Sequence, residues 1–207
     1  MFHMHNMVSP ENNRPLADRI RPVILADVVG QGHILGEDKM LRRAIEEDRV
    51  PSMMLWGPPG TGKTTIAKVV AHTTGAEFVQ LSAVENGVKD IRAVLDEART
   101  RRTANNQKTI LFIDEIHRFN KGQQDALLPA VENGTIILIG ATTENPSFSL
   151  NAALLSRCRV FVLNTLEPVH VLDLLNRAIH DVEYGLGSKS LQIEDGALDF
   201  LANMSNG

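Results

Sequence analysis

Residues 53–65 read Met-Met-Leu-Trp-Gly-Pro-Pro-Gly-Thr-Gly-Lys-Thr-Thr, and this stretch decides the fold of the chain. Its central part, Gly57 to Thr64, fits the pattern G-x-x-x-x-G-K-[ST]. An apolar run precedes the pattern, and apolar residues at helical spacing follow it. This order predicts a strand, a phosphate-binding loop and a helix, which is the context that the motif requires. A glycine-rich turn before an ordinary helix is the alternative, and the complete pattern in this setting disfavours it.

The residue types in this loop suit the binding of an anion. Glycine lacks a Cβ, so we expect Gly57, Gly60 and Gly62 to adopt unusual backbone dihedrals and to lie close to a phosphate. Successive N–H groups at the start of the helix then form a nest for the anion. Lys63 adds a charge that can reach the outer phosphates, and Thr64 can offer its hydroxyl to Mg²⁺. The predicted nucleotide-binding residues are Gly57, Pro58, Pro59, Gly60, Thr61, Gly62, Lys63, Thr64 and Thr65.

The bulk composition is that of an ordinary globular protein, with 43% hydrophobic and 22% charged residues among 207. The net charge of −4 gives no whole-chain signature of nucleic-acid binding, so any such contact must be local. The single cysteine, Cys158, leaves no disulfide framework within these residues and suits a reducing cytoplasm. No apolar stretch reaches the ~18 residues of a membrane span, and the first residues lack the apolar core of a secretion signal, so we expect no membrane partner.

Apolar patterns divide the chain into alternating strands and helices up to about residue 165. We expect one strand just before Gly57 and further strands at 77–81, 109–113, 135–141 and 160–163. The strands at 109–113 and 135–141 contain few polar residues, so they should be buried on both faces, as in a parallel sheet. The predicted fold class is therefore α/β, a three-layer P-loop NTPase core around a five-stranded parallel sheet. Helices are expected at 37–48, 88–102, 121–132, 167–182 and 194–204.

Polar residues follow two of the predicted strands. Asp114 and Glu115 come directly after the strand at 109–113, and Thr142 and Thr143 follow the next strand. Ligands of such folds bind at the carboxyl ends of the strands, where these side chains should meet. Asp114 can hold a Mg²⁺ that bridges the outer phosphates, and Glu115 can orient and polarise an attacking water. Acidic pairs at strand ends are common, and the complete loop upstream favours the functional interpretation.

Three further groups carry open alternatives. A threonine hydroxyl at 142 or 143 can position the same water, or it can simply cap the strand. Arg157 is either a solvated surface residue or an arginine finger, and its spacing does not decide. In residues 117–121, His-Arg-Phe-Asn-Lys, the basic groups can grip a phosphate backbone while Phe119 stacks on a base. They can equally form a solvated loop with Phe119 inside. Cys158 has no nearby base and is interpreted as a packing residue.

Together these motifs resemble those of the AAA+ ATPases, and within them the clamp-loader-like group. GPPGTGKT, LFIDE, GATT and the triplet Ser156-Arg157-Cys158 stand in the order that this group uses. The strings HRFNKGQQDALLP and IGATTENPSF look like the replication-associated recombination protein A family, also called maintenance-of-genome-stability protein A. Its eukaryotic relative is the Werner helicase interacting protein. The resemblance covers about residues 14–207, and the last two strings are its more specific part.

The resemblance implies roles that spacing does not supply. Thr143 is similar to the first sensor, and Arg157 is similar to the finger that reaches the nucleotide of a neighbouring subunit, which implies a homo-oligomeric ring or partial ring. Residues 14–31 are similar to the segment that wraps the adenine. The implied catalytic residues are Lys63, Glu115, Thr143 and Arg157, and the implied metal ligands are Thr64 and Asp114.

The implied activity is Mg²⁺-dependent ATP hydrolysis stimulated by DNA, at forks or junctions of single-stranded and duplex DNA. Single-stranded-DNA-binding protein is the implied partner, and the expected location is bacterial, cytoplasmic and nucleoid-associated. The expected domains are a disordered arm at 1–14, the ATPase core at 15–165 and the start of a helical lid at 166–207. The second sensor arginine and the oligomerisation region of the family have no match, so we expect a fragment that binds and hydrolyses nucleotide weakly and fails to assemble.

Two other functions are alternatives to this hypothesis. A nucleotide-dependent recruitment scaffold that hydrolyses ATP slowly is the principal alternative. In that case Glu115→Gln would leave the biological function largely intact, whereas Lys63→Ala would abolish it. A small-molecule kinase is disfavoured, because no acceptor-binding lid is visible and the pair Asp114-Glu115 suits the activation of water better.

Overall fold

The computed structural model describes residues 14–205, which form two compact units. The larger unit is Val23–Thr165. The smaller unit is the described part of Met1–Pro22 together with the described part of Leu166–Gly207. The predicted disordered arm at 1–14 lies outside the described residues, apart from Arg14.

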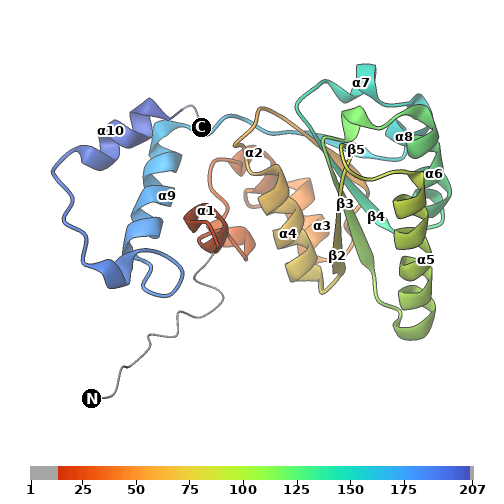
Figure 1. Cartoon of the computed structure of the whole chain (residues 1–207), viewed down its shortest axis with the longest axis horizontal. Helices are drawn as coiled ribbons and strands as arrows, with labels where there is room; N and C mark the ends of the chain where they lie inside the picture. The colour runs from red at the N-terminus through yellow and green to blue at the C-terminus, as the bar shows by residue number, and fades with distance from the viewer. Residues whose placement is uncertain (1–13, 206–207) are drawn as a thin grey trace, which may run out of the picture. The chain divides into compact units, whose positions relative to one another are not determined.

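A five-stranded sheet forms the centre of the larger unit (Figure 1). Its strands are β1 (Met53–Trp56), β2 (Glu77–Ser82), β3 (Thr109–Asp114), β4 (Ile137–Thr142) and β5 (Arg159–Val162). The order across the sheet is β2-β3-β4-β1-β5, and every neighbouring pair is parallel. The predicted parallel sheet of five strands is therefore confirmed.

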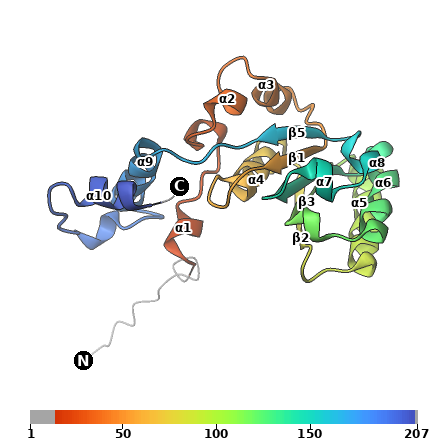
Figure 2. The same ribbon diagram turned by 90° about the horizontal axis from the view of Figure 1, so that it is seen from above.

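Helices cover both faces of this sheet, which gives the three predicted layers (Figures 1 and 2). On one face lie α2 (Gly32–Leu35), α3 (Met40–Glu46) and α4 (Lys63–Thr74). On the other face lie α5 (Val88–Asn105), α6 (Lys121–Glu132) and α8 (Ala152–Leu155). The short elements η2 (Leu25–Asp27), η3 (Ile116–Arg118) and α7 (Pro146–Ser149) complete the unit.

The two faces explain why β3 is apolar at four successive positions, 110–113. Ile110 and Phe112 belong to the core cluster beneath α4, whereas Leu111 and Ile113 belong to the cluster beneath α5 and α6. Side chains alternate between the two faces of a strand, so a strand covered on both sides has no position for a solvated residue. All four of these residues are fully buried. Their burial confirms the expectation drawn from the apolar run.

Local hydrogen bonds set the ends of several elements away from their expected positions. β4 begins at Ile137 and not at residue 135, because the Asn133 side chain accepts hydrogen bonds from the amide and the hydroxyl of Thr135, at 2.9 and 2.6 Å. The helix expected at 37–48 is reduced to α3, since Asp38 and Asp48 on either side have positive φ. α4 ends at Thr74 and is capped by Gly75, whose φ is +63°.

The smaller unit contains α1 (Leu16–Arg19), α9 (Pro168–His180), η4 (Gly187–Lys189) and α10 (Ala197–Met204). α9 is shorter than expected because Asp181 accepts hydrogen bonds from the amides of Glu183 and Tyr184, which form a turn. α9 and α10 pack together, and Ala178 and Ala202 are buried.

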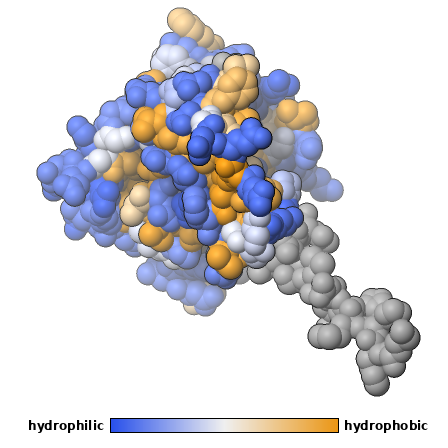
Figure 3. Space-filling view, turned by 90° about the vertical axis from the view of Figure 1, so that its left-hand side faces the viewer, coloured by the Kyte–Doolittle hydropathy of each residue, from blue (hydrophilic) through white to orange (hydrophobic). Residues whose placement is uncertain are grey.

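Several apolar side chains of α10 remain at the surface, and Figure 3 shows apolar side chains among polar ones on this side of the molecule. They are Phe200, Leu201 and Met204.

Between residues 14 and 205, no helix has the length and apolar character of a membrane span.

Candidate active site

The parallel sheet brings the predicted site residues to one edge. Gly57 follows β1, while Asp114 and Thr142 are the last residues of β3 and β4. Parallel strands end on the same side of a sheet, and β4 lies between β3 and β1, so the three positions are neighbours. The Gly57 amide donates to the Thr142 carbonyl at 3.2 Å, which joins the loop directly to the end of β4.

Two glycines of the loop have the unusual dihedrals that the sequence predicted. Gly60 and Gly62 have φ of +82° and +90°, in the left-handed region that favours glycine. Nothing lies within 4 Å of the position where a Cβ of Gly62 would be, so backbone conformation and not space requires glycine there.

Gly57 is glycine for a different reason, and the sequence-based explanation was wrong at this position. Its φ is not positive, but a Cβ would lie 2.5 Å from the Leu163 carbonyl oxygen and 3.1 Å from the Leu163 Cβ. Leu163 comes directly after β5, and its amide donates to the Trp56 carbonyl at 2.7 Å. The close approach of two backbone segments therefore excludes a side chain at Gly57.

Lys63 lies beneath the loop with a relative exposure of 8%. Its ammonium donates to the carbonyls of Gly57 and Pro58, both at 2.7 Å. Burial lowers the pKa of Lys63, and the carboxylates of Glu115 and Asp114 act in the opposite direction. Lys63 follows the loop after β1, and both carboxylates stand at the end of β3, so all three lie at the carboxyl edge of the sheet, as a shared binding site requires.

The start of α4 is suited to an anion. The helix begins at Lys63 after Gly62, and no side chain of the described residues caps it. The first amides of a helix have no acceptor within the helix, and they carry the positive end of its dipole. Two glycines in left-handed conformation precede the amides of Lys63 and Thr64, and helix starts of this kind are common binding sites for phosphates.

The acidic pair is held in a specific backbone conformation. The Glu115 amide donates to Asp114 Oδ1 at 3.1 Å, and Glu115 has a φ of +52°. A non-glycine residue in this region costs on the order of 1–3 kcal/mol, and such residues concentrate at functional sites. Both side chains are half-buried. A hydroxyl at Thr64 and a carboxylate at Asp114 are the hard oxygen donors that Mg²⁺ prefers.

The loop after the acidic pair resolves one of the open alternatives. Phe119 has a relative exposure of 3% and packs in the core beneath α5 and α6, so it is not available to stack on a base. The His117 side chain is also largely buried, at 9% exposure. Arg118 and Lys121 are exposed. The interpretation that places Phe119 inside is confirmed.

The two threonines at the end of β4, Thr142 and Thr143, differ in their surroundings. Thr142 is fully buried, and its hydroxyl contacts His117 Nδ1 at 3.0 Å and accepts from the Glu144 amide at 3.0 Å. Thr143 is exposed, and within residues 14–205 its hydroxyl forms no hydrogen bond. The side chain expected to act as a sensor therefore lies at the surface, beside a buried threonine.

Arg157 lies after α8, away from the loop of its own chain. Its guanidinium pairs with the Glu132 carboxylate at the end of α6 and donates to the Ala153 carbonyl at 2.8 Å and to Ser156 Oγ at 3.0 Å. None of these partners belongs to the loop or to the acidic pair. Burial raises the pKa of the neighbouring Cys158 to about 12, and this thiol packs against the core.

A buried glutamine beside the loop, Gln31, is a residue that sequence reasoning missed. Gln31, with 1% exposure, donates to the carbonyls of Thr61 at 3.2 Å and Asn164 at 2.8 Å and accepts from the Asn164 amide at 3.1 Å. It therefore ties the loop to the segment after β5. The resemblance placed Gln31 only within the segment that wraps the adenine, and the one available signal was a glutamine between two glycines.

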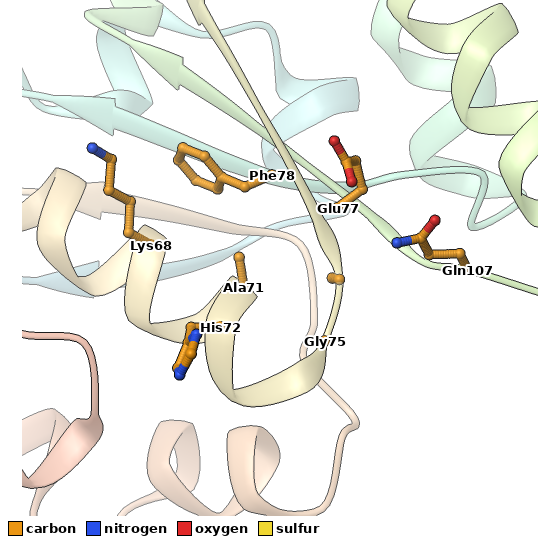
Figure 4. Close-up of a pocket in the computed structure, with 8 residues that line it drawn as sticks. Lys68, Ala71, His72, Gly75, Glu77, Phe78 and Gln107 are labelled. Carbon is orange, nitrogen blue, oxygen red and sulfur yellow. The ribbon is translucent and has the colours of Figure 1, made fainter. Parts of the chain in front are cut away.

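An open hollow lies apart from the predicted site residues, between the later part of α4 and the start of β2 (Figure 4). Lys68 and His72 project from the helix, and Glu77 and Phe78 belong to the strand. The hollow is open, and none of the predicted site residues lines it.

The fold and the site together define a class of protein. A parallel sheet with a G-x-x-x-x-G-K-T loop after β1 and an acidic pair at the end of β3 is the arrangement of a P-loop nucleoside triphosphatase. Residues 53–166 match the model of the "ATPase family associated with various cellular activities (AAA)", and the chain belongs to this family.

Curated relatives narrow the comparison. The chain is 52% identical to Replication-associated recombination protein A of Haemophilus influenzae over 193 residues, which are 93% of this chain and 43% of that protein. It is 55% identical to the protein of the same name from Coxiella burnetii over 91% of this chain and 42% of the relative. It is 48% identical to "ATPase WRNIP1" of Dictyostelium discoideum, over 93% of this chain and 22% of that protein. The predicted resemblance is confirmed, and the chain spans less than half the length of these relatives.

Among solved structures, the chain resembles the RuvB Holliday junction branch migration motor of Thermotoga maritima. The TM-score is 0.71 at 28% sequence identity, and the match covers 89% of this chain and 59% of that chain. This likeness supports the fold class from an independent direction.

Gly57→Ala tests the packing explanation for the first loop glycine. The added Cβ would meet the Leu163 carbonyl oxygen at 2.5 Å, so we expect a loss of about 1–3 kcal/mol in the free energy of unfolding. Gly32→Ala is the matched control, because nothing lies within 4 Å of its Cβ position and its φ is not positive. Denaturant unfolding of both variants measures the difference. Equal stability of the two variants would show that the loop moves freely away from Leu163.

Proposed function

We propose that this chain binds ATP with Mg²⁺ at the carboxyl edge of the sheet and hydrolyses it. The observation that carries the proposal is the shared site of Lys63 and the acidic pair: the lysine lies under the loop and its charge interacts with Asp114 and Glu115. A cation, two carboxylates and uncapped helix amides at one edge suit a triphosphate with its metal better than any other ligand class.

Each residue has a defined part in this proposal. The backbone of residues 57–65 holds the phosphates, and Lys63 balances their charge. Thr64 and Asp114 would hold Mg²⁺, which supplies further neutralisation of phosphate charge when it is bound. Glu115 accepts a hydrogen bond from water and orients it toward the terminal phosphoryl group. Thr143 contacts that water or the phosphate from the end of β4.

The domain assignment also belongs to the proposal. We assign residues 15–165 to the ATPase core and residues 166–207 to the start of a helical lid. The elements after residue 166 are α9, η4 and α10, all of them helical, which supports the lid, as does the surface position of Phe200, Leu201 and Met204 on α10. Apolar side chains on a helix surface are suited to packing against further protein.

We further propose that the cycle of ATP binding and hydrolysis serves DNA maintenance. The relatives are named for replication-associated recombination and the structural neighbour for Holliday junction branch migration, which supports forked or junction DNA as a partner. Arg118 and Lys121 offer exposed positive charge just after the acidic pair. A homo-oligomer, in which Arg157 reaches the nucleotide of the next subunit, and contact with single-stranded-DNA-binding protein complete this proposal.

Two substitutions separate binding from hydrolysis. Lys63→Ala removes the buried charge under the loop, so we expect loss of ATP binding, measured with a fluorescent ATP analogue. Glu115→Gln keeps the shape but weakens the acceptor for water, so we expect binding to persist while phosphate release falls about 10²-fold or more. Lys68→Ala, on the same helix but outside the loop, is the control. Hydrolysis by Glu115→Gln at the unsubstituted rate would contradict the assigned role, and persistence of its function in cells would favour the recruitment scaffold.

Mixing two inactive variants of the intact protein tests the role of Arg157 between subunits. Arg157→Ala lacks the proposed finger, and Lys63→Ala lacks its own nucleotide site but retains its finger. A finger contributes about 10³–10⁵ in rate where it acts, so each variant alone should be inactive. In the mixture, phosphate release should reappear at the sites of the Arg157→Ala subunits. An Arg157→Ala variant with undiminished activity would leave Arg157 as a surface residue paired with Glu132.

Stimulation by DNA is tested by phosphate release with and without forked DNA. We expect a several-fold rise in rate at low salt and a smaller rise at high salt, because contacts with phosphates weaken as counterions compete. Arg118→Ala with Lys121→Ala should reduce the rise, and Arg99→Ala on the far part of α5 is the control. An identical rate with and without DNA would remove this part of the proposal.

A further inference from the structure

One largely buried polar side chain near the acidic pair has no part in the proposed hydrolysis. His117 belongs to η3 and has 9% exposure. Its Nε2 lies 3.2 Å from Glu115 Oε2 and 3.7 Å from Glu144 Oε1, and its Nδ1 lies 3.0 Å from Thr142 Oγ1. The ring therefore stands between the proposed water-orienting carboxylate and the end of β4.

The neighbours of the ring determine which nitrogen carries a proton. Nε2 faces two carboxylates, which only accept hydrogen bonds, so Nε2 must be protonated. The Thr142 hydroxyl has one proton and two neighbouring acceptors, Nδ1 at 3.0 Å and the Glu144 carbonyl at 3.2 Å. In a neutral ring Nδ1 accepts this proton; when Nδ1 is itself protonated, the hydroxyl donates to the Glu144 carbonyl. In a charged ring both nitrogens donate. Either form gives a donor toward Glu115 Oε2.

The Glu115 backbone is fixed, but its side chain needs a second anchor. The Glu115 amide is bonded to Asp114 Oδ1, which sets the main chain. A glutamate side chain has three rotatable bonds, so a fixed backbone alone leaves the carboxylate free to rotate. The contact with His117 Nε2, at 3.2 Å, involves one carboxylate oxygen, Oε2, and leaves Oε1 to accept from water.

The anchor is itself connected to the nucleotide loop. Thr142 Oγ1 accepts from the Glu144 amide at 3.0 Å, which fixes the hydroxyl that contacts His117. The Thr142 carbonyl accepts from the Gly57 amide at 3.2 Å. His117 thus links Glu115 to Thr142, the same residue that accepts from the Gly57 amide of the loop.

We propose that His117 is a positioning residue for Glu115: it holds Oε2 so that Oε1 is presented to the attacking water. This inference rests on the proposed function, because it requires Glu115 to act on water. A histidine that merely packs between η3 and β4 would instead affect the folded structure as a whole. The two roles predict different results for two substitutions of similar size.

The first experiment compares His117→Leu with His117→Gln. Leucine fills the space but has no donor, whereas the glutamine amide can donate to Glu115 and accept from Thr142. We expect His117→Leu to lower kcat about 10²-fold, with KM and nucleotide affinity near those of the unsubstituted chain, and His117→Gln to recover most of the rate. In a Glu115→Gln background, His117→Leu should add no further loss.

Several outcomes would overturn the proposal. These are an unchanged kcat in His117→Leu, equal losses in the leucine and glutamine variants, and an additive loss in the Glu115→Gln background. A parallel loss of nucleotide affinity and thermal stability would assign His117 a structural role. The single variant Glu115→Gln is measured alongside, because its failure to lower the rate would defeat the proposed function itself.

A second experiment does not depend on hydrolysis. Long-range proton–nitrogen NMR spectra report the protonation of both ring nitrogens, and His117→Gln identifies the signals of His117. We expect a protonated Nε2 whose shift changes in Glu115→Gln. An Nε2 without a proton, or a signal indifferent to Glu115→Gln, would refute the contact on which the inference stands.

Discussion

The pairing of β1 on both sides constrains the rest of the structure. β1 has only four residues, yet it is parallel to β4 on one side and to β5 on the other. The loop that follows is consequently held from two directions, by the Thr142 carbonyl on the Gly57 amide and by Leu163 against the Gly57 Cα. A loop that is fixed before an anion arrives loses little conformational entropy on binding. The sheet thus positions the loop through the place where β1 ends, between β4 and β5.

The fold could be predicted from sequence because its strongest signals are local. A strand such as β3, apolar at successive positions, fits only a sheet covered on both faces, and the glycine pattern after β1 fixes the strand–loop–helix unit. The acidic pair follows from the same logic, since it comes directly after a strand. The ends of elements were harder, because single side chains such as Asn133 and Asp181 divert backbone amides from the regular pattern.

Contacts between distant segments were beyond sequence reasoning. In the sequence, His117 precedes α6 and Thr142 follows it, yet their side chains are in contact. Gln31 donates to Asn164, although the two residues stand near opposite ends of the sequence of the larger unit. Nothing near these residues indicates their partners, because the partners are set by strand order. Phe119 shows the same limit: an aromatic in a basic loop can face a base or the core, and only packing beneath α5 and α6 decides.

The glutamines of the specific string HRFNKGQQDALLP show what such a string can encode. Gln123 donates to the Asn86 carbonyl at 2.9 Å, and Gln124 donates to the carbonyls of Phe119 at 2.9 Å and Ser149 at 3.2 Å. Both side chains are buried, and a buried amide without partners would cost about 1–3 kcal/mol. These residues therefore join loops around the site and have no chemical part in it.

Lys63 shows the electrostatic consequence of building an anion site. Burial lowers its pKa below the ordinary value of 10.5, so the folded chain binds the proton less readily than the unfolded chain does. The contribution of Lys63 to stability therefore rises with pH between its lowered pKa and 10.5, and at neutral pH the buried charge is a cost. The two loop carbonyls and the neighbouring carboxylates offset part of that cost. A bound polyanion would stabilise the charged form of Lys63 in the same way as these carboxylates and far more strongly. Binding would therefore recover free energy that the burial of Lys63 costs the folded chain.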